Sequence, residues 1–125
     1  MLTLRSDEAS LADARDLVGV YLEDHCRGVD GQSVRLVVSE LVTNALRHAG
    51  GAWTLEVDRR PGLLTVGVRD EDGTPPDARP LALDGRGGLG LHIVERLAGR
   101  VRVTPAAQGK TVSVWWPVLP AQRGG

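Results

Sequence analysis

The stretch V-R-L-V-V-S-E-L-V-T-N-A-L-R-H-A-G, from Val34 to Gly50, decides the fold. Its apolar side chains recur at the i, i+3, i+4, i+7 spacing of one buried helical face. They are Val34, Val37, Val38, Leu41, Val42, Ala45 and Leu46. Asp30 is a suitable N-cap before this stretch, and Gly50-Gly51 would break the helix. We therefore predict a central amphipathic helix that ends at about Ala49.

Three polar residues form a second line along the edge of that face. Glu40, Asn44 and His48 are spaced by four residues, so a carboxylate and a carboxamide point to the same half-buried place. Polar residues are common at such an edge, and an ordinary structural role stays open. The other interpretation is a binding site that needs an acceptor and a metal ligand.

Length and composition limit the class of protein. The chain has 125 residues, a hydrophobic content of 42% and a formal net charge of -1, which predicts a single globular domain over residues 1–125. The balanced charge does not favour direct binding of nucleic acid or of a membrane surface. No apolar run approaches the ~20 residues of a membrane span, and no secretory signal is evident, so we expect a cytoplasmic protein.

The N-terminal part predicts a strand and a helix. Leu2 and Leu4 alternate with polar residues as in a short strand. Ser6 or Asp7 is expected to cap the next helix, and a glycine is expected to stop it near Arg27-Gly28. The apolar face of that helix consists of Leu11, Ala14, Val18, Tyr21 and Leu22. Cys26, the only cysteine, is expected to be a partly buried thiol on a helix.

Alternating patterns after the central helix predict four strands. Two of them, at 53–58 and 64–70, are joined by Pro61-Gly62 in a hairpin turn, and the second ends at Asp70. Two more are expected at 101–104 and 111–117. In the last one, the neighbouring Trp115 and Trp116 should place one ring on each face of the sheet. Residues 118–125 are predicted to be a disordered tail.

Between the second and third of these strands lie a loop and a helix. Residues 71–86 are rich in Pro and Gly and have no periodicity, which predicts a long loop. Leu89, Ile93 and Leu97 then line a third helix. The predicted fold class is α+β: a two-layer sandwich with a mixed, mostly antiparallel sheet and helices on one face.

Two further features carry possible chemistry. Gly85, Gly87, Gly88 and Gly90 open the third helix, where free N–H groups and the positive end of the helix dipole could receive phosphates. Taken alone, such a glycine pattern is a weak signal. Asp70 could accept a hydrogen bond from an exocyclic amine, or could simply form the turn before Asp72-Gly73.

Taken together in this order, three motifs carry a family resemblance. They are S-E-L-V-T-N-A-L-R-H-A, then V-R-D-E-D-G, then R-G-G-L-G-L-H-I-V. The chain resembles the Bergerat-type ATP-binding superfamily, which includes gyrase, heat-shock chaperones, histidine kinases and mismatch-repair proteins. Within it, the chain looks most like the anti-sigma-factor serine kinases of bacterial stress and sporulation switches, in their short actinobacterial form.

This resemblance implies roles for individual residues. Glu40 would be the general base, Asn44 would ligate Mg²⁺ between the phosphates of ATP, and Asp70 would hold the adenine amine. Arg86 would lie near the γ-phosphate. The remaining residues implied in nucleotide binding are Gly73, Gly88, Leu89, Gly90, Leu91 and Thr111.

The resemblance also implies a function and partners. An ATP-binding anti-sigma regulator would phosphorylate a serine on a small STAS-type antagonist, would bind a sigma factor, and could form a homodimer. Two alternatives stay open. One is a module that has lost catalysis and sequesters its partner by docking. The other is a detached histidine-kinase catalytic domain, against which the sequence offers no dimerisation helix with an acceptor histidine.

Overall fold

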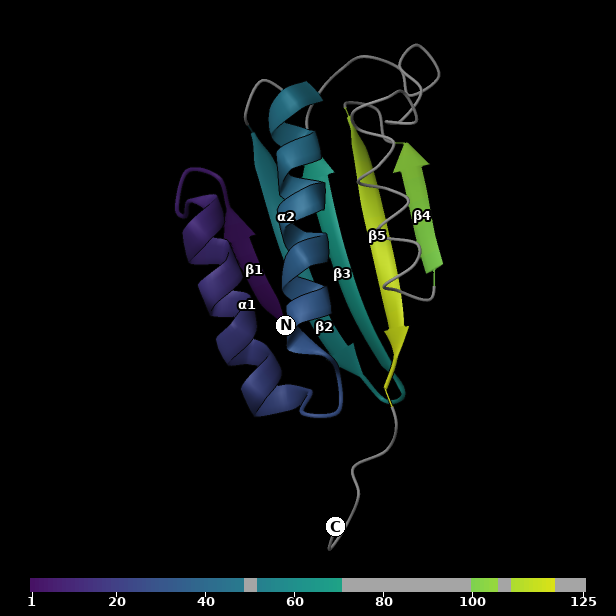
Figure 1. Cartoon of the computed structure of the whole chain (residues 1–125). Coiled ribbons are helices and arrows are strands. Elements are labelled where there is room, and N and C mark those ends of the chain that lie inside the picture. Colours follow the sequence, from purple (N-terminus) through teal and green to yellow (C-terminus); the bar gives the residue numbers. More distant parts are fainter. Residues whose placement is uncertain (49–51, 71–99, 106–108, 119–125) are drawn as a thin grey trace, which may run out of the picture.

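The described part of the chain is an antiparallel sheet with two helices on one face (Figure 1). The computed structural model describes residues 1–48, 52–70, 100–105 and 109–118. The strands are β1 (Leu2–Arg5), β2 (Trp53–Arg60), β3 (Leu63–Asp70), β4 (Arg100–Pro105) and β5 (Lys110–Pro117), in the spatial order β1-β2-β3-β5-β4. All four described pairings are antiparallel. The predicted α+β sandwich is confirmed, and its described pairings are antiparallel throughout where a mixed sheet was predicted.

The helices α1 (Leu11–His25) and α2 (Gly31–His48) pack on the sheet through their apolar faces. In α2, the six stripe residues from Val34 to Ala45 are buried, as the spacing predicts. Each fully buried valine stabilises the fold by roughly 1.5–3 kcal/mol. Leu46 was predicted in this stripe but is 44% exposed. Leu46 belongs to the last turn of α2, which extends past the ends of β2 and β3 (Figure 1).

Alternate residues of the strands form the sheet side of the hydrophobic core. In β2 and β3, Leu55, Val57, Leu64 and Val66 are fully buried beneath the helices. The predicted hairpin is confirmed: Arg60 pairs with Leu63, and Gly62 has a φ of +75°, which favours glycine at the second turn position. None of the helices in the described ranges is long and apolar enough to cross a membrane.

The C-terminal strand also follows its alternating pattern. Trp116 is buried in the core, whereas Trp115 lies on the other face, with the Arg102 guanidinium carbon 5.7 Å from its ring centroid. Val118, the first residue of the predicted tail, is instead buried, and its N–H donates to the Gly62 carbonyl at 3.0 Å. The predicted loop at 71–86, the third helix and the tail beyond Val118 fall outside the described residues.

At the start of each helix, a side chain that caps the free backbone N–H groups marks the first helical residue. Asp30 caps α2 as predicted: it accepts hydrogen bonds from the Gln32 N–H at 3.1 Å and the Ser33 hydroxyl at 2.8 Å, which lower the pKa of its carboxyl. For α1 the prediction of Ser6 or Asp7 was wrong. Ser6 is engaged with β2, because its Oγ accepts from the Trp53 N–H at 3.2 Å.

The N-cap of α1 is Ser10, in a capping box with Asp13. Its hydroxyl accepts from the Asp13 N–H and the Asp13 carboxylate accepts from the Ser10 N–H, both at 3.1 Å. We predict that Ser10→Ala lowers the free energy of unfolding by ~1 kcal/mol. Urea denaturation would measure this loss, with the exposed Asp7→Ala as the matched control. Equal effects of the two changes would contradict the assignment.

The end of α1 also differs from the prediction. The helix ends at His25, with Cys26 as its C-cap, so Gly28 does not supply the stop. Cys26 is 2% exposed, more deeply buried than predicted, and its carbonyl accepts from the Val29 N–H in a turn. The helix is therefore capped at a buried residue, two positions before Gly28.

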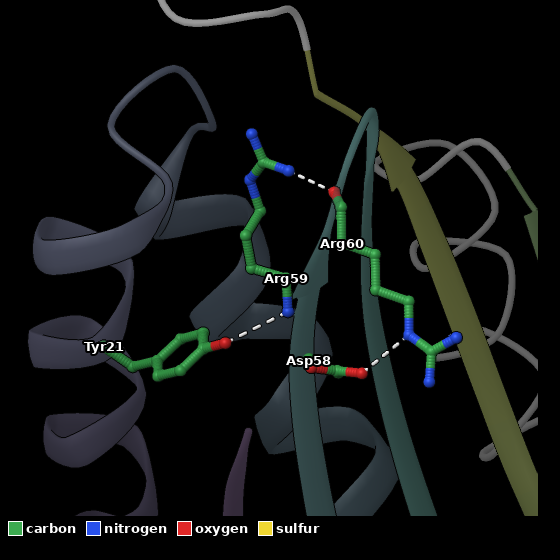
Figure 2. Close-up of polar contacts among 4 residues, drawn as sticks. All are labelled: Tyr21, Asp58, Arg59 and Arg60. Atoms are coloured by element: carbon green, nitrogen blue, oxygen red, sulfur yellow. Dashed lines mark hydrogen bonds and ion pairs between the residues drawn. The ribbon is translucent and has the colours of Figure 1, made fainter.

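Figure 2 shows how the end of β2 is tied to α1. The Tyr21 hydroxyl accepts from the Arg59 backbone N–H at 3.0 Å. The Arg59 guanidinium donates to the Arg60 carbonyl, and the Arg60 Nε donates to Asp58 Oδ2 at 2.8 Å. The Arg60 hydrogen bond lowers the pKa of the Asp58 carboxyl. The charge of Arg59 and its hydrogen bond also influence the pKa of the Cys26 thiol.

Burial raises the pKa of the Cys26 thiol above its ordinary value of 9.0, while the charge of Arg59 and its hydrogen bond oppose the shift. Above pH 9 the unfolded chain therefore loses this proton before the folded chain does. We predict that the stability of the wild type falls more steeply from neutral pH to about pH 10 than that of Cys26→Ala. Parallel pH dependences in urea denaturation would refute this prediction.

Candidate functional site

The central helix presents two of the predicted functional side chains. Glu40 and Asn44 lie one turn apart on α2 and are both half-buried, next to the fully buried Val37 and Val38. This is the edge position that the four-residue spacing predicts. His48 is the last residue of α2, and its side chain is not among those described. Glu40 and Asn44 are thus available at the border of the core.

Asp70, the last residue of β3, is a buried carboxylate with a cationic partner. It is 3% exposed and pairs in register with Lys110, the first residue of β5, which is 9% exposed. The Lys110 Nζ lies 2.6 Å from Asp70 Oδ2, and the Lys110 backbone N–H donates to Oδ1 at 3.3 Å. Removing one partner of such a buried pair typically costs about 3–5 kcal/mol.

These residues are gathered at one end of the sandwich. The second half of α2, the end of β3 and the start of β5 all lie at the same end of the molecule (Figure 1). α2 packs across β2 and β3, on the face to which the buried Asp70 belongs. The half of α2 that carries Glu40 and Asn44 and the strand ends that carry Asp70 and Lys110 therefore lie at the same end of the sandwich, although they come from separate segments of the chain.

Thr111 is placed differently from the other predicted residues. Side chains of a strand alternate between faces, and Thr111 lies with Gly67, Ser113 and Trp115 along a pocket on the face opposite α1 and α2. The structure therefore does not bring Thr111 to Asp70; Lys110 occupies that position instead. The role of Thr111 in nucleotide binding stays a prediction.

Sequence reasoning missed Lys110, although a signal was present. Val112, Val114 and Trp116 are the buried members of β5, and Lys110 continues the same alternation. A lysine in a row of core positions requires an anion. The row alone does not say which anion, because Asp70 is 40 residues away in sequence.

The rest of the predicted site falls on residues that the structure does not describe. They are Gly73, Arg86, Gly88, Leu89, Gly90 and Leu91. Their assigned roles in nucleotide binding stay predictions. The candidate residues that the structure describes are thus Glu40 and Asn44 on α2, with Asp70 and Lys110 at the paired strand ends.

The comparison with known families decides the kind of domain. A family profile described as "Histidine kinase-like ATPase domain" matches residues 4–116. This chain belongs to that family. The histidine kinase-like ATPase domain is an ATP-binding domain, so the assignment agrees with the Bergerat-type resemblance of the motifs. No match was found among curated proteins.

Solved structures support the same assignment. The histidine kinase-like ATPase domain described here is similar to the histidine kinase domain of the blue-light activated histidine kinase of Erythrobacter litoralis EL346, with 28% identity and a TM-score of 0.56 over 70% of this chain and 44% of that one. A second structure of that kinase gives 28% identity and a TM-score of 0.57, over 72% and 32%. This chain therefore spans less than half of either kinase chain.

A third similar structure extends over the whole chain. It is the histidine kinase domain of the E. coli osmosensor EnvZ, with 19% identity and a TM-score of 0.57 over 100% of this chain and 93% of that one. At this identity the likeness shows the fold alone. Both helices and the five-stranded sheet thus follow the architecture of a histidine kinase-like ATPase domain.

The side chains of the site fit the ligands that such a domain takes. Mg²⁺ prefers oxygen ligands and is usually held by one or two protein groups together with waters and phosphates. The half-buried Asn44 offers one such oxygen. Within the described ranges no group of three or more His, Cys, Asp or Glu residues forms a metal cage by itself. This donor set suits a metal that arrives with a nucleotide.

Proposed function

We propose that this domain binds ATP with Mg²⁺ and transfers the γ-phosphate to a serine of a small antagonist protein, as an anti-sigma regulatory kinase. One observation carries the nucleotide part: Asp70 is a buried carboxylate at the end of β3, at the same end of the sandwich as Glu40 and Asn44. A buried carboxylate can accept a hydrogen bond from the exocyclic amine of adenine and so orient the base.

The residues on α2 suit phosphoryl transfer, which depends on positioning and on charge neutralisation. Asn44 would hold Mg²⁺, which neutralises the charge of the phosphates when bound. Glu40 would accept the proton of the attacking serine hydroxyl as its oxygen bonds to the γ-phosphorus, and ADP would leave. The family motif adds Arg86 and the glycines at 88 and 90 as groups near the phosphates.

The partners follow from the order and composition of the three motifs. Their resemblance to the anti-sigma serine kinases supports a STAS-type antagonist as the substrate and a sigma factor as the second partner. Such partners act in transcription, so this role would place the domain in the cytoplasm. A homodimer is part of the same proposal. Regulation would depend on which partner the ATP-bound domain holds.

A second candidate is supported by the structural comparisons. The similar structures are domains of histidine kinases, and two of them come from a protein that is 28% identical to this chain over the matched part. On this alternative, the domain would phosphorylate a histidine of a separate protein. Glu40, Asn44 and Asp70 would keep the same roles in nucleotide binding and catalysis, and only the acceptor would differ.

Two measurements test the proposal. Calorimetry of the purified chain with ATP and Mg²⁺ is expected to give saturable binding. Transfer of a labelled γ-phosphate to a candidate STAS-type antagonist is then expected to give an acid-stable phosphoserine. An acid-labile product would favour the histidine-kinase alternative. Binding of ATP and of the antagonist without transfer would favour a docking module, and no ATP binding would refute the proposed function.

A further inference from the structure

We propose that Lys110 determines base specificity, and that it allows the site to bind 6-oxo purine nucleotides, with guanine or hypoxanthine as the base, as well as ATP. The inference rests on the proposed function, in which the base of the nucleotide lies against Asp70. It concerns a residue that the motif resemblance did not include. Lys110 lies directly opposite Asp70, the proposed base-binding carboxylate, on the adjacent strand.

The geometry holds the ammonium of Lys110 next to that carboxylate. Nζ lies 2.6 Å from Asp70 Oδ2, and the two residues face each other in the β3–β5 register. Their strand neighbours on the same face, Val68 and Val112, are both buried. Because Lys110 is also buried, its charged group has little access to solvent and stays with the anion.

The ammonium changes which bases the site can recognise. A carboxylate only accepts hydrogen bonds, so by itself it suits the 6-amino group of adenine and faces the lone pairs of a 6-oxo group unfavourably. An ammonium carries three N–H donors, of which the ion pair uses one. Lys110 and Asp70 together therefore present a donor beside an acceptor.

This combination matches both purine classes. With adenine, Asp70 would accept from the 6-amino group and Lys110 would donate to N7, so the two side chains keep their order and the base shifts by one ring position between the two classes. With guanine or hypoxanthine, Lys110 would donate to the 6-oxo group and Asp70 would accept from the N1–H. A site discriminates strongly between two bases when it forms all its hydrogen bonds with one and leaves polar groups unpaired with the other. A site that forms its hydrogen bonds with both bases discriminates only weakly.

A purely structural role of Lys110 makes a different prediction. If the ion pair only neutralises Asp70, then removing the ammonium destabilises the fold but leaves the ratio of GTP to ATP affinity unchanged. If Lys110 contacts the base, the ratio itself changes. The ratio of affinities within one protein is therefore the informative quantity, because a general loss of stability affects both nucleotides equally.

The test is calorimetry of the full chain with ATP, GTP and ITP, each with Mg²⁺. The wild type is expected to bind GTP and ITP within about tenfold of ATP, which is ~1.4 kcal/mol. Lys110→Thr, which keeps a hydroxyl beside Asp70, is expected to lose at least about tenfold in GTP and ITP affinity relative to ATP. Ser113→Ala is the matched control, because Ser113 lies on the same strand but on the opposite face.

The outcomes separate this inference from the proposed function. A wild type that prefers ATP by more than about tenfold, or an unchanged ratio in Lys110→Thr, would overturn the role of Lys110 while ATP binding stands. No binding of any nucleotide would overturn the proposed function and this inference with it. The ratio measured for the wild type needs no variant, so an unstable Lys110→Thr chain would not remove the test.

Discussion

Asp70→Asn is expected to weaken ATP binding by about 1.5–3 kcal/mol, which is roughly a 10- to 150-fold loss of affinity. The carboxylate is buried at the end of β3, where it would accept a hydrogen bond from the base. An amide keeps the shape of the side chain but has no charge, and it can present its NH₂ group where an acceptor is required. Calorimetry with ATP and Mg²⁺ measures the loss directly.

The same change also leaves Lys110 as a buried ammonium without its anion, so the chain should be less stable. The double variant Asp70→Asn/Lys110→Thr separates the two effects. It should recover part of the lost stability in a melting curve but should still bind ATP weakly. An unchanged affinity in Asp70→Asn would mean that Asp70 serves only the ion pair and the end of the strand.

Glu40→Ala is expected to lower phosphate transfer by about 10²- to 10⁴-fold while the affinity for ATP stays nearly the same. A general base acts mainly in the transition state, so its removal affects the rate more than ground-state binding. Asn44→Ala is expected to lose both, because the metal that Asn44 would hold joins the domain to the phosphates. The pair lies one turn apart on α2, so the two variants probe one site.

The decisive assay is transfer of the γ-phosphate to a candidate antagonist, measured together with a melting curve. Gln32→Ala is a suitable control, because Gln32 is exposed near the other end of α2. Binding of the antagonist should survive Glu40→Ala. Equal transfer by the wild type and Glu40→Ala would overturn the kinase mechanism, whereas losses of stability alone would identify Glu40 and Asn44 as ordinary edge residues.

Local sequence was sufficient for most of the described elements. The spacing from Val34 to Ala45 predicts α2 and its buried face, Asp30 predicts its start, and Pro61-Gly62 predicts the β2–β3 hairpin. These features depend on residues a few positions apart. Their physical causes are the helical and strand periods, the capping hydrogen bonds and the turn conformation of glycine.

The three motifs predicted the family, which periodicity alone does not, because the motifs occur in a fixed order along the chain. A profile match over residues 4–116 confirms the histidine kinase-like ATPase domain. The anti-sigma role, the partners and the individual site residues stay predictions. Several of those residues, from Gly73 to Leu91, lie in the part of the chain that the structure does not describe.

Only the tertiary structure decided which residues meet across long separations. The sheet order β1-β2-β3-β5-β4 engages Ser6 with Trp53, which leaves Ser10 to cap α1. The same order places Lys110 opposite Asp70 and turns Thr111 to the other face. Strand register has a period of two, so a shift of one residue exchanges the faces. Local sequence does not select between such registers, because the choice depends on which segments pack together in the core.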